Sequence, residues 1–159
     1  MNVVIIGCGR VGAFLAGLLD TGGHKVTIVD LERGAFAHLP QTFNGTTILG
    51  NGTDLDVLRQ AGIESADAFL ALTEGDNRNL MAAQIAKEIF GVKHVTSKVN
   101  DPIRARVYRD HGITTFSRTT ILGTLLHAML TGNKEIGPKL MALANSHEDE
   151  MAGVDLAER

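Results

Sequence analysis

Residues 3–12 read VVIIGCGRVG and decide the fold. The first four are β-branched and apolar, as is typical of a strand buried on both faces. Gly7, Gly9 and Gly12 follow with a spacing that permits a tight turn, close approach of a pyrophosphate to the backbone and close packing of a helix on the strand. The helix that begins after this turn would offer free N–H groups to phosphate. Taken alone, the pattern also fits a tight turn that binds no ligand.

A second strand-like run, residues 26–29, leads directly into Asp30, which lies 18 residues after Gly12. An acid at this place accepts hydrogen bonds from ribose hydroxyls and disfavours a 2′-phosphate, so NAD is a better candidate than NADP. Asp30 would also serve as a turn or helix-capping residue. The complete order of strand, turn, helix, strand and acid favours nucleotide binding.

Two side chains inside the glycine turn have chemistry of their own. The Arg10 guanidinium is placed to hold phosphate oxygens in bidentate fashion, and a solvated arginine is the plainer alternative. Cys8 is the single cysteine of the chain, so it forms no internal disulfide, which fits a reducing compartment. A position beside a helix N-terminus could lower the pKa of the Cys8 thiol, but we expect Cys8 to be a small filler at an unconstrained position of the motif.

Short strand-like runs alternate with helix-like segments along most of the chain. Strands are predicted over residues 3–6, 26–29, 46–49, 68–72, 94–98 and 114–116, and helices over residues 10–19, 32–39, 55–61, 77–90 and 103–110. Glycines at 22–23 and 91 are placed to end helices, and Asp101-Pro102 to begin one. This alternation predicts an α/β fold of Rossmann type, a doubly wound parallel sheet of six strands with helices on both faces.

The end of the chain has a different character. Thr119 or Thr120 is placed to cap a helix over residues 121–130 that is apolar nearly all round, and such a helix must be covered. We therefore expect it to pack against a second subunit as a dimerisation helix. Residues 133–144 predict one more helix, and the acidic tail beyond it should fray. The predicted division is a nucleotide-binding domain over 1–131 and an extension over 132–159.

Composition bounds the classes of protein to consider. The chain has 159 residues, about one domain, and a net charge of −3, which gives no reason to expect a nucleic-acid or anionic-membrane surface. It opens directly on the first strand, without the basic flank of a signal peptide, and its longest apolar helix is too short to span a bilayer. We expect a cytoplasmic protein that meets a membrane only through a partner.

Three later segments also follow predicted strands. Residues 50–54 read GNGTD, residues 71–80 read ALTEGDNRNL and residues 98–102 read KVNDP. Together with GCGRVG at 7–12, they resemble the KTN domain, also called the TrkA N-terminal or RCK domain. That domain is the regulatory, nucleotide-binding module of potassium channels and transporters. The resemblance extends from residue 1 to about residue 130.

The resemblance implies a function without catalysis. Such domains dimerise, assemble into rings on the cytoplasmic face of a membrane pore, and change ring geometry when ATP, ADP, NADH or NAD binds. By this likeness the chain is a cytoplasmic regulatory subunit of a potassium transporter or channel, a homodimer or larger ring, controlled by an adenine nucleotide (NAD/NADH or ATP/ADP).

The resemblance also implies which residues bind the nucleotide. The phosphates would be lined by Gly7, Gly9, Arg10, Val11 and Gly12; the ribose would be held by Asp30 and flanked by Leu31 and Arg33; the adenine would be bordered by Asn51, Gly52, Thr53, Leu72 and Thr73; and Lys98 would lie near the terminal phosphates or the second half of a dinucleotide.

Simpler roles compete for several of these positions. Asn51-Gly52 is a common turn dipeptide, and Thr53 or Asp54 would cap the next helix without any ligand. Thr73 would suit an ordinary loop, and Lys98 a solvated strand end. The positions nevertheless follow strand carboxyl ends, where ligands bind in open parallel sheets.

Two departures from the family pattern limit the resemblance. Relatives that favour ATP have an acid after the sixth strand that helps to hold a metal ion, whereas this chain has Ser117-Arg118-Thr119, so no metal site is predicted. Many relatives continue into a C-terminal ligand-binding lobe, for which the 29 residues after Leu130 are too few.

Two other functions stay open at this point. A small NAD-dependent oxidoreductase would use the same cofactor site, but the six histidines are scattered without metal-ligand spacing and no nucleophile elbow is present. The other is a free-standing redox or energy sensor whose partner is not a potassium pore.

Overall fold

Six parallel strands form the centre of the protein, whose structure, a computed structural model, describes residues 1–131. The strands are β1 (Asn2–Ile6), β2 (Lys25–Asp30), β3 (Thr46–Leu49), β4 (Ala68–Ala71), β5 (His94–Lys98) and β6 (Thr114–Phe116). The helix predicted over 133–144 and the tail beyond it lie outside the described residues.

The strand order is β3-β2-β1-β4-β5-β6, and every neighbouring pair is parallel. The order reverses between β1 and β4, where Ile6 pairs with Val29 of β2 on one side and with Ala71 of β4 on the other. Ligands of open parallel sheets bind beyond the strand carboxyl ends at such a reversal. The predicted six-stranded, doubly wound Rossmann-like sheet is confirmed.

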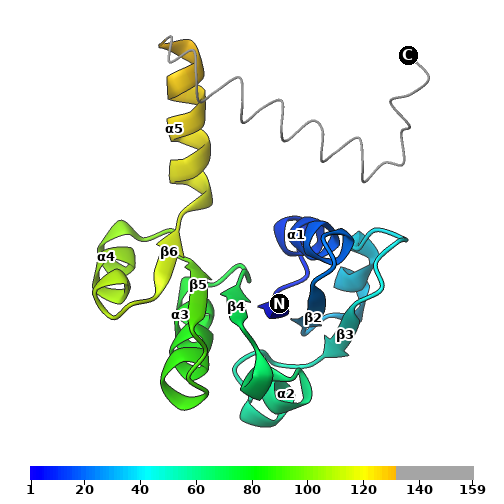
Figure 1. Cartoon of the computed structure of the whole chain (residues 1–159). Helices are drawn as coiled ribbons and strands as arrows, with labels where there is room; N and C mark the ends of the chain where they lie inside the picture. Colours follow the sequence, from blue (N-terminus) through cyan, green and yellow to red (C-terminus); the bar gives the residue numbers. More distant parts are fainter. Residues whose placement is uncertain (132–159) are drawn as a thin grey trace, which may run out of the picture. The chain divides into compact units, whose positions relative to one another are not determined.

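Helices cover both faces of the sheet (Figure 1). On one face, α1 (Arg10–Thr21) and the 3-10 helix η1 (Arg33–His38) pack over alternate strand residues such as Val3 and Ile5. On the other face, α2 (Leu55–Gln60), the 3-10 helix η2 (Ile63–Ser65) and α3 (Asp76–Gln84) pack over Val4 and Ile6. Next to α3, α4 (Pro102–Asp110) buries Ala105 against Leu80. The core is therefore two apolar layers separated by the sheet.

The predicted helix boundaries are confirmed where a capping signal is present. The Asp101 carboxylate accepts hydrogen bonds from the backbone N–H groups of Ile103 and Arg104, with Pro102 in the first turn. Gly22 caps the C-terminus of α1, and Gly91 has a φ of +67°, a conformation that favours glycine.

Two predicted helices differ in kind from the expectation. The segment over 32–39 is a short 3-10 helix, because Gly34 lowers its helix propensity and the chain turns away at Pro40. The helix over 77–90 stays α-helical only to Gln84 and continues as the π-helix η3 (Ile85–Ile89). Hydrophobic spacing does not distinguish these helix types over so few turns.

A second unit of the chain begins at Arg118, whereas the first comprises Met1–Ser117. Its described part is the helix α5 (Arg118–Leu130), which starts three residues before the predicted helix. None of its side chains is buried, and its large exposed apolar residues are Ile121, Leu122, Leu126, Met129 and Leu130. Among residues 1–131, no helix is long and apolar enough to cross a membrane.

Candidate functional site

The glycine turn joins β1 to α1 at the strand reversal. Gly7 has a φ of +96°, which L side chains rarely adopt, and its N–H donates to the Val29 carbonyl at 2.8 Å. A Cβ on Gly7 would lie 2.8 Å from the Thr73 backbone nitrogen. Position 7 therefore accepts only glycine, because the backbone after β4 passes directly against it.

The other two glycines of the motif meet opposite surroundings. A Cβ on Gly12 would lie 2.0 Å from the Gly7 carbonyl oxygen, so this glycine lets α1 pack against the turn. A Cβ on Gly9 would meet no atom within 4 Å. Gly9 is the N-cap of α1 and has no side chain to cap the free N–H groups of that helix. The turn thus presents open space and unsatisfied donors, as a phosphate requires.

The Asp30 carboxylate is held in place by the backbone on both sides. One oxygen accepts from the Cys8 N–H at 2.6 Å and the other from the Glu32 N–H at 2.9 Å. Each carboxylate oxygen has a further lone pair to accept a hydroxyl proton. An acceptor-only group here suits the two hydroxyls of a ribose and repels a phosphate.

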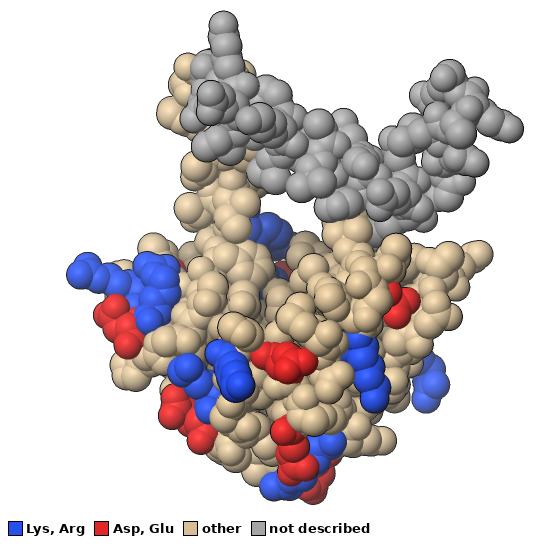
Figure 2. All heavy atoms as spheres, in the orientation of Figure 1, with Lys and Arg blue, Asp and Glu red and all other residues tan. Residues whose placement is uncertain are grey.

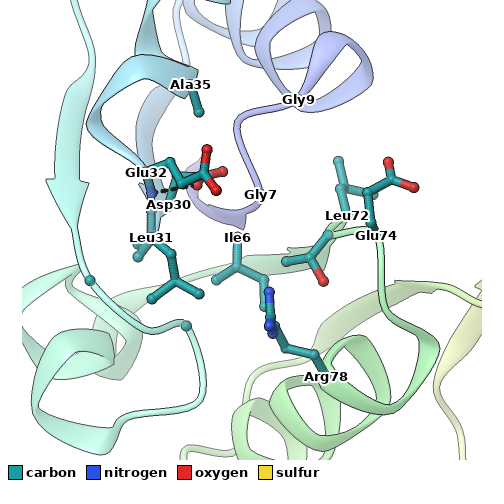
Figure 3. A pocket seen from close by; sticks show the side chains of 14 residues that line it. Ile6, Gly7, Gly9, Asp30, Leu31, Glu32, Ala35, Leu72, Glu74 and Arg78 are labelled. Carbon is teal, nitrogen blue, oxygen red and sulfur yellow. Dashed lines mark hydrogen bonds between the residues drawn. The ribbon is translucent and has the colours of Figure 1, made fainter.

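A cavity of about 370 Å³ lies at the carboxyl ends of β1, β2 and β4. Figure 3 shows Gly7 and Gly9 on one side of it, Asp30 and Leu31 on a second, and Leu72 and Glu74 on a third. The glycine turn and the acid therefore open into one space.

Half of the predicted site residues line this cavity: Gly7, Gly9, Asp30, Leu31, Gly52, Leu72 and Thr73. The rest are not part of its wall: Arg10, Val11, Gly12, Arg33, Asn51, Thr53 and Lys98.

Local contacts explain most of the residues outside the wall. Arg10 and Val11 are exposed on the first turn of α1. The Asn51 side chain folds back on its own loop and accepts from the Thr53 N–H and hydroxyl at 3.1 and 2.9 Å. Asp54, and not Thr53, caps α2.

Lys98 lies behind the wall. Only 3% of the residue is exposed, and its ammonium nitrogen is 3.3 Å from the carboxylate of Glu74, which does line the cavity. The simple alternative of a solvated strand-end lysine is therefore wrong. The Lys98 ammonium is therefore paired with a carboxylate of the cavity wall and is not itself part of that wall.

A buried asparagine that the sequence did not single out holds the strand ends together. Asn79 has no exposed surface; its side-chain oxygen accepts from the Thr73 N–H at 2.9 Å and the Thr73 hydroxyl at 2.7 Å. Its amide donates to the carbonyls of Thr73 and Lys98 at 2.9 and 3.0 Å. Because the Thr73 hydroxyl proton is committed to Asn79, that oxygen can only accept from a ligand.

Seven further residues that were not predicted line the cavity: Ile6, Val29, Glu32, Ala35, Gly50, Glu74 and Arg78. Ile6, Val29 and Gly50 are neighbours of strand ends, so their positions follow from the topology. Glu74 and Arg78 belong to the segment 71–80, whose letters alone do not show which side chains turn inward.

Charges of both signs are distributed over the protein surface. On the face shown in Figure 2, Lys and Arg side chains alternate with Asp and Glu, and neither sign forms a continuous patch. Within residues 1–131, no three His, Cys, Asp or Glu side chains gather where they would hold a metal ion.

Cys8 belongs to the glycine turn, and its side chain is buried. Burial, together with the nearby charge of Asp30, raises the pKa of the Cys8 thiol to about 11 from an ordinary value of 9.0. A group whose pKa is raised by folding stabilises the folded state below its ordinary pKa, and this contribution disappears as the pH rises through the folded pKa.

We therefore expect a thiol reagent at pH 8 to label Cys8 only when the protein opens. Between pH 9 and 11, the Cys8 ionisation should lower the free energy of unfolding by roughly 1–2 kcal/mol. Urea titrations of the wild type and Cys8→Ala at pH 7.5 and 10.5 measure this contribution. If the free energy of unfolding falls equally in both proteins between the two pH values, the ionisation of Cys8 does not contribute to this pH dependence.

Comparison with known proteins identifies relatives of this chain. The model of the TrkA-N domain matches residues 3–118. The chain is 48% identical over 115 residues to the Trk system potassium uptake protein TrkA of Streptomyces coelicolor, an alignment that covers 72% of this chain and 52% of that protein. The chain spans about half the length of the curated relatives it matches first.

Solved structures share the fold at low sequence identity. The TrkA-N domain of the inner membrane protein ybaL from Escherichia coli superposes with a TM-score of 0.72 at 14% identity, over 81% of this chain and 96% of that one. The structure of GsuK bound to ADP superposes with a TM-score of 0.68 at 22% identity, over 84% of this chain and 34% of that one. The GsuK channel bound to NAD superposes with a TM-score of 0.65 at 21% identity, over 77% of this chain and 22% of that one.

Proposed function

This chain belongs to the TrkA-N domain family, and on that premise we propose that it is the cytoplasmic, nucleotide-binding regulatory subunit of a potassium transporter or channel. The observation that carries the proposal is the cavity at the strand reversal, into which both the open glycine turn and the anchored Asp30 carboxylate face. The name of the Streptomyces coelicolor relative supports the potassium system.

The proposed ligand is an adenine nucleotide, NAD/NADH or ATP/ADP. The N–H groups of the turn at Gly9 would hold the phosphates, and Asp30 would accept from the ribose hydroxyls. The adenine would be bordered by Gly52, Leu72 and Thr73, and Leu31, which the resemblance places beside the ribose, would here also cover the adenine. Lys98 would lie near the terminal phosphates, or the second half of a dinucleotide, and would exchange its ion pair with Glu74 for the ligand. The ligands in the GsuK structures, ADP and NAD, support this class.

The proposed unit of function is residues 1–131 as a homodimer or larger ring. Exposed apolar side chains on α5, such as Ile121 and Leu126, support its role as the dimerisation helix, because a second subunit would remove them from water.

We propose binding without catalysis. The curated relatives that the chain matches first are named as potassium uptake proteins, which supports a regulatory role. Incubation with NADH and a panel of carbonyl compounds, followed by the loss of NADH absorbance, tests this. Turnover at enzyme-like rates would contradict it.

Calorimetric titration of the purified protein with ATP, ADP, NAD and NADH tests the central proposal. We expect at least one of them to bind with a one-to-one stoichiometry per chain. If none binds, the site is not a nucleotide site and the proposed function is wrong.

Arg10 should contribute to binding through phosphate alone. Arg10 is exposed at the start of α1. Arg10→Ala should therefore lower the affinity for ADP or NAD by about fivefold to tenfold and leave the affinity for adenosine unchanged. Arg106→Ala, which removes the same charge from an exposed position on α4, is the matched control. Equal weakening of all three ligands by Arg10→Ala would contradict a phosphate contact.

A further inference from the structure

We propose that the guanidinium of Arg78 stacks on the purine ring of the bound nucleotide and contributes to the affinity of the site for the base. This inference rests on the proposed function and deepens it. It assigns a ligand contact to a residue outside the glycine turn, on the helix that follows β4.

Arg78 is the only basic side chain on the wall of the cavity among residues 1–131. It lies in the first turn of α3, and Figure 3 shows its side chain extending from that helix toward Ile6 in the middle of the cavity. It makes no hydrogen bond or ion pair with any residue of this described range, although Glu32 and Glu74 line the same cavity. Its guanidinium is thus directed at the ligand space.

Arg78 approaches the cavity from the opposite face of the sheet to α1, whose N-terminus is the proposed phosphate site. The Ile6 side chain belongs to the apolar layer of α2 and α3, whereas Cys8 of the glycine turn belongs to the layer of α1. Phosphates would bind at the N-terminus of α1, on the α1 side of the sheet. Arg78 enters from the α3 side, so the nearer part of a bound nucleotide is its base.

The surroundings of Arg78 suit a flat aromatic ring. Gly50 and Gly52 line the cavity beside Ile6, and Gly52 packs so closely that a Cβ there would lie 2.7 Å from Ile6 Cγ2. Leu31, half exposed, lies on the β2 side of the cavity (Figure 3). A planar, weakly hydrated guanidinium stacks on aromatic faces better than a lysine ammonium does. Leu31 and Arg78 would therefore cover the two faces of the purine.

Three variants separate base stacking from phosphate binding. Arg78→Ala should weaken adenosine, ADP and NAD by the same factor, about fivefold. Arg78→Lys should recover little of this loss, because it restores charge but no planar group. Arg78→Trp should bind adenosine at least as well as the wild type. Since the chain has no tryptophan, adenosine should also quench the single introduced fluorophore.

Titrations followed by NMR chemical shifts measure weak adenosine binding, and circular dichroism with urea unfolding checks that each variant folds. If ADP weakens while adenosine does not, and Arg78→Lys restores ADP, Arg78 binds phosphate and the proposal is wrong. Unchanged affinities for all three ligands in Arg78→Ala would also overturn it. Failure of the wild type to bind any nucleotide would instead refute the proposed function itself. If Arg78→Trp does not fold, Arg78→Ala and Arg78→Lys still distinguish base stacking from phosphate binding.

Discussion

Replacing Gly12 with alanine is expected to lower the free energy of unfolding by about 3 kcal/mol or more. The new Cβ would lie 2.0 Å from the Gly7 carbonyl oxygen, so α1 or the turn must move. Gly7 has little freedom to move, because its own backbone is packed against Thr73. For a chain of this size, the melting temperature should fall by about 10 °C. Urea and thermal unfolding measure both quantities.

Gly9→Ala is the matched control, with the same added methyl group three residues earlier. Its Cβ would meet no atom of the protein within 4 Å, so the fold should lose no more than about 1 kcal/mol, from the poorer N-cap. The methyl group would occupy the space proposed for phosphate and weaken ADP or NAD by about tenfold or more.

The pair therefore separates stability from binding within one motif. A Gly12→Ala protein as stable as the wild type would show that the close packing of α1 on the turn is not required. A Gly9→Ala protein that binds ADP with unchanged affinity would show that phosphate does not lie over the turn.

Replacing Asn79 with alanine should lower the free energy of unfolding by about 3 kcal/mol. The buried amide makes four hydrogen bonds, so its removal leaves the Thr73 N–H and the carbonyls of Thr73 and Lys98 unsatisfied. Urea unfolding measures the loss. Because Thr73 lines the cavity, ADP affinity should fall as well, and calorimetry measures that change.

Asn77→Ala is the control for this substitution, on the same helical turn. The Asn77 side chain is exposed and accepts from Arg104, so its removal should change stability by about 0.5 kcal/mol or less. Similar losses in the two variants would mean that the buried network around Asn79 does not hold the ends of β4 and β5 together.

Some of the site could be predicted because it depends on the backbone alone. Glycines such as Gly7 and Gly12 are needed where a strand turns sharply into a closely packed helix, and the acid at the end of β2 lies beside that turn through parallel pairing. Asp101-Pro102 and Gly91 mark helix ends through local hydrogen bonding and φ preference. These features require no knowledge of distant contacts.

Other parts of the site depend on how separate elements pack. Asn77, Arg78 and Asn79 are consecutive on α3, yet the first is exposed, the second lines the cavity and the third is buried. Their directions follow from the rotation of α3 on the sheet, which the packing of Ala82 and Ala83 determines. Lys98 likewise became a buried partner of Glu74 only once β5 lay beside β4.

The sequence by itself determined the parallel six-stranded sheet, the glycine turn and the acid opposite it, because strand periodicity, glycine conformation and motif spacing are local properties of the chain. Tertiary structure alone decided which side chains line the cavity. It placed Arg78 on the cavity wall, buried Asn79 against Thr73 and paired Lys98 with Glu74. These arrangements arise where helices and strands distant in sequence meet, and no single segment carries that information.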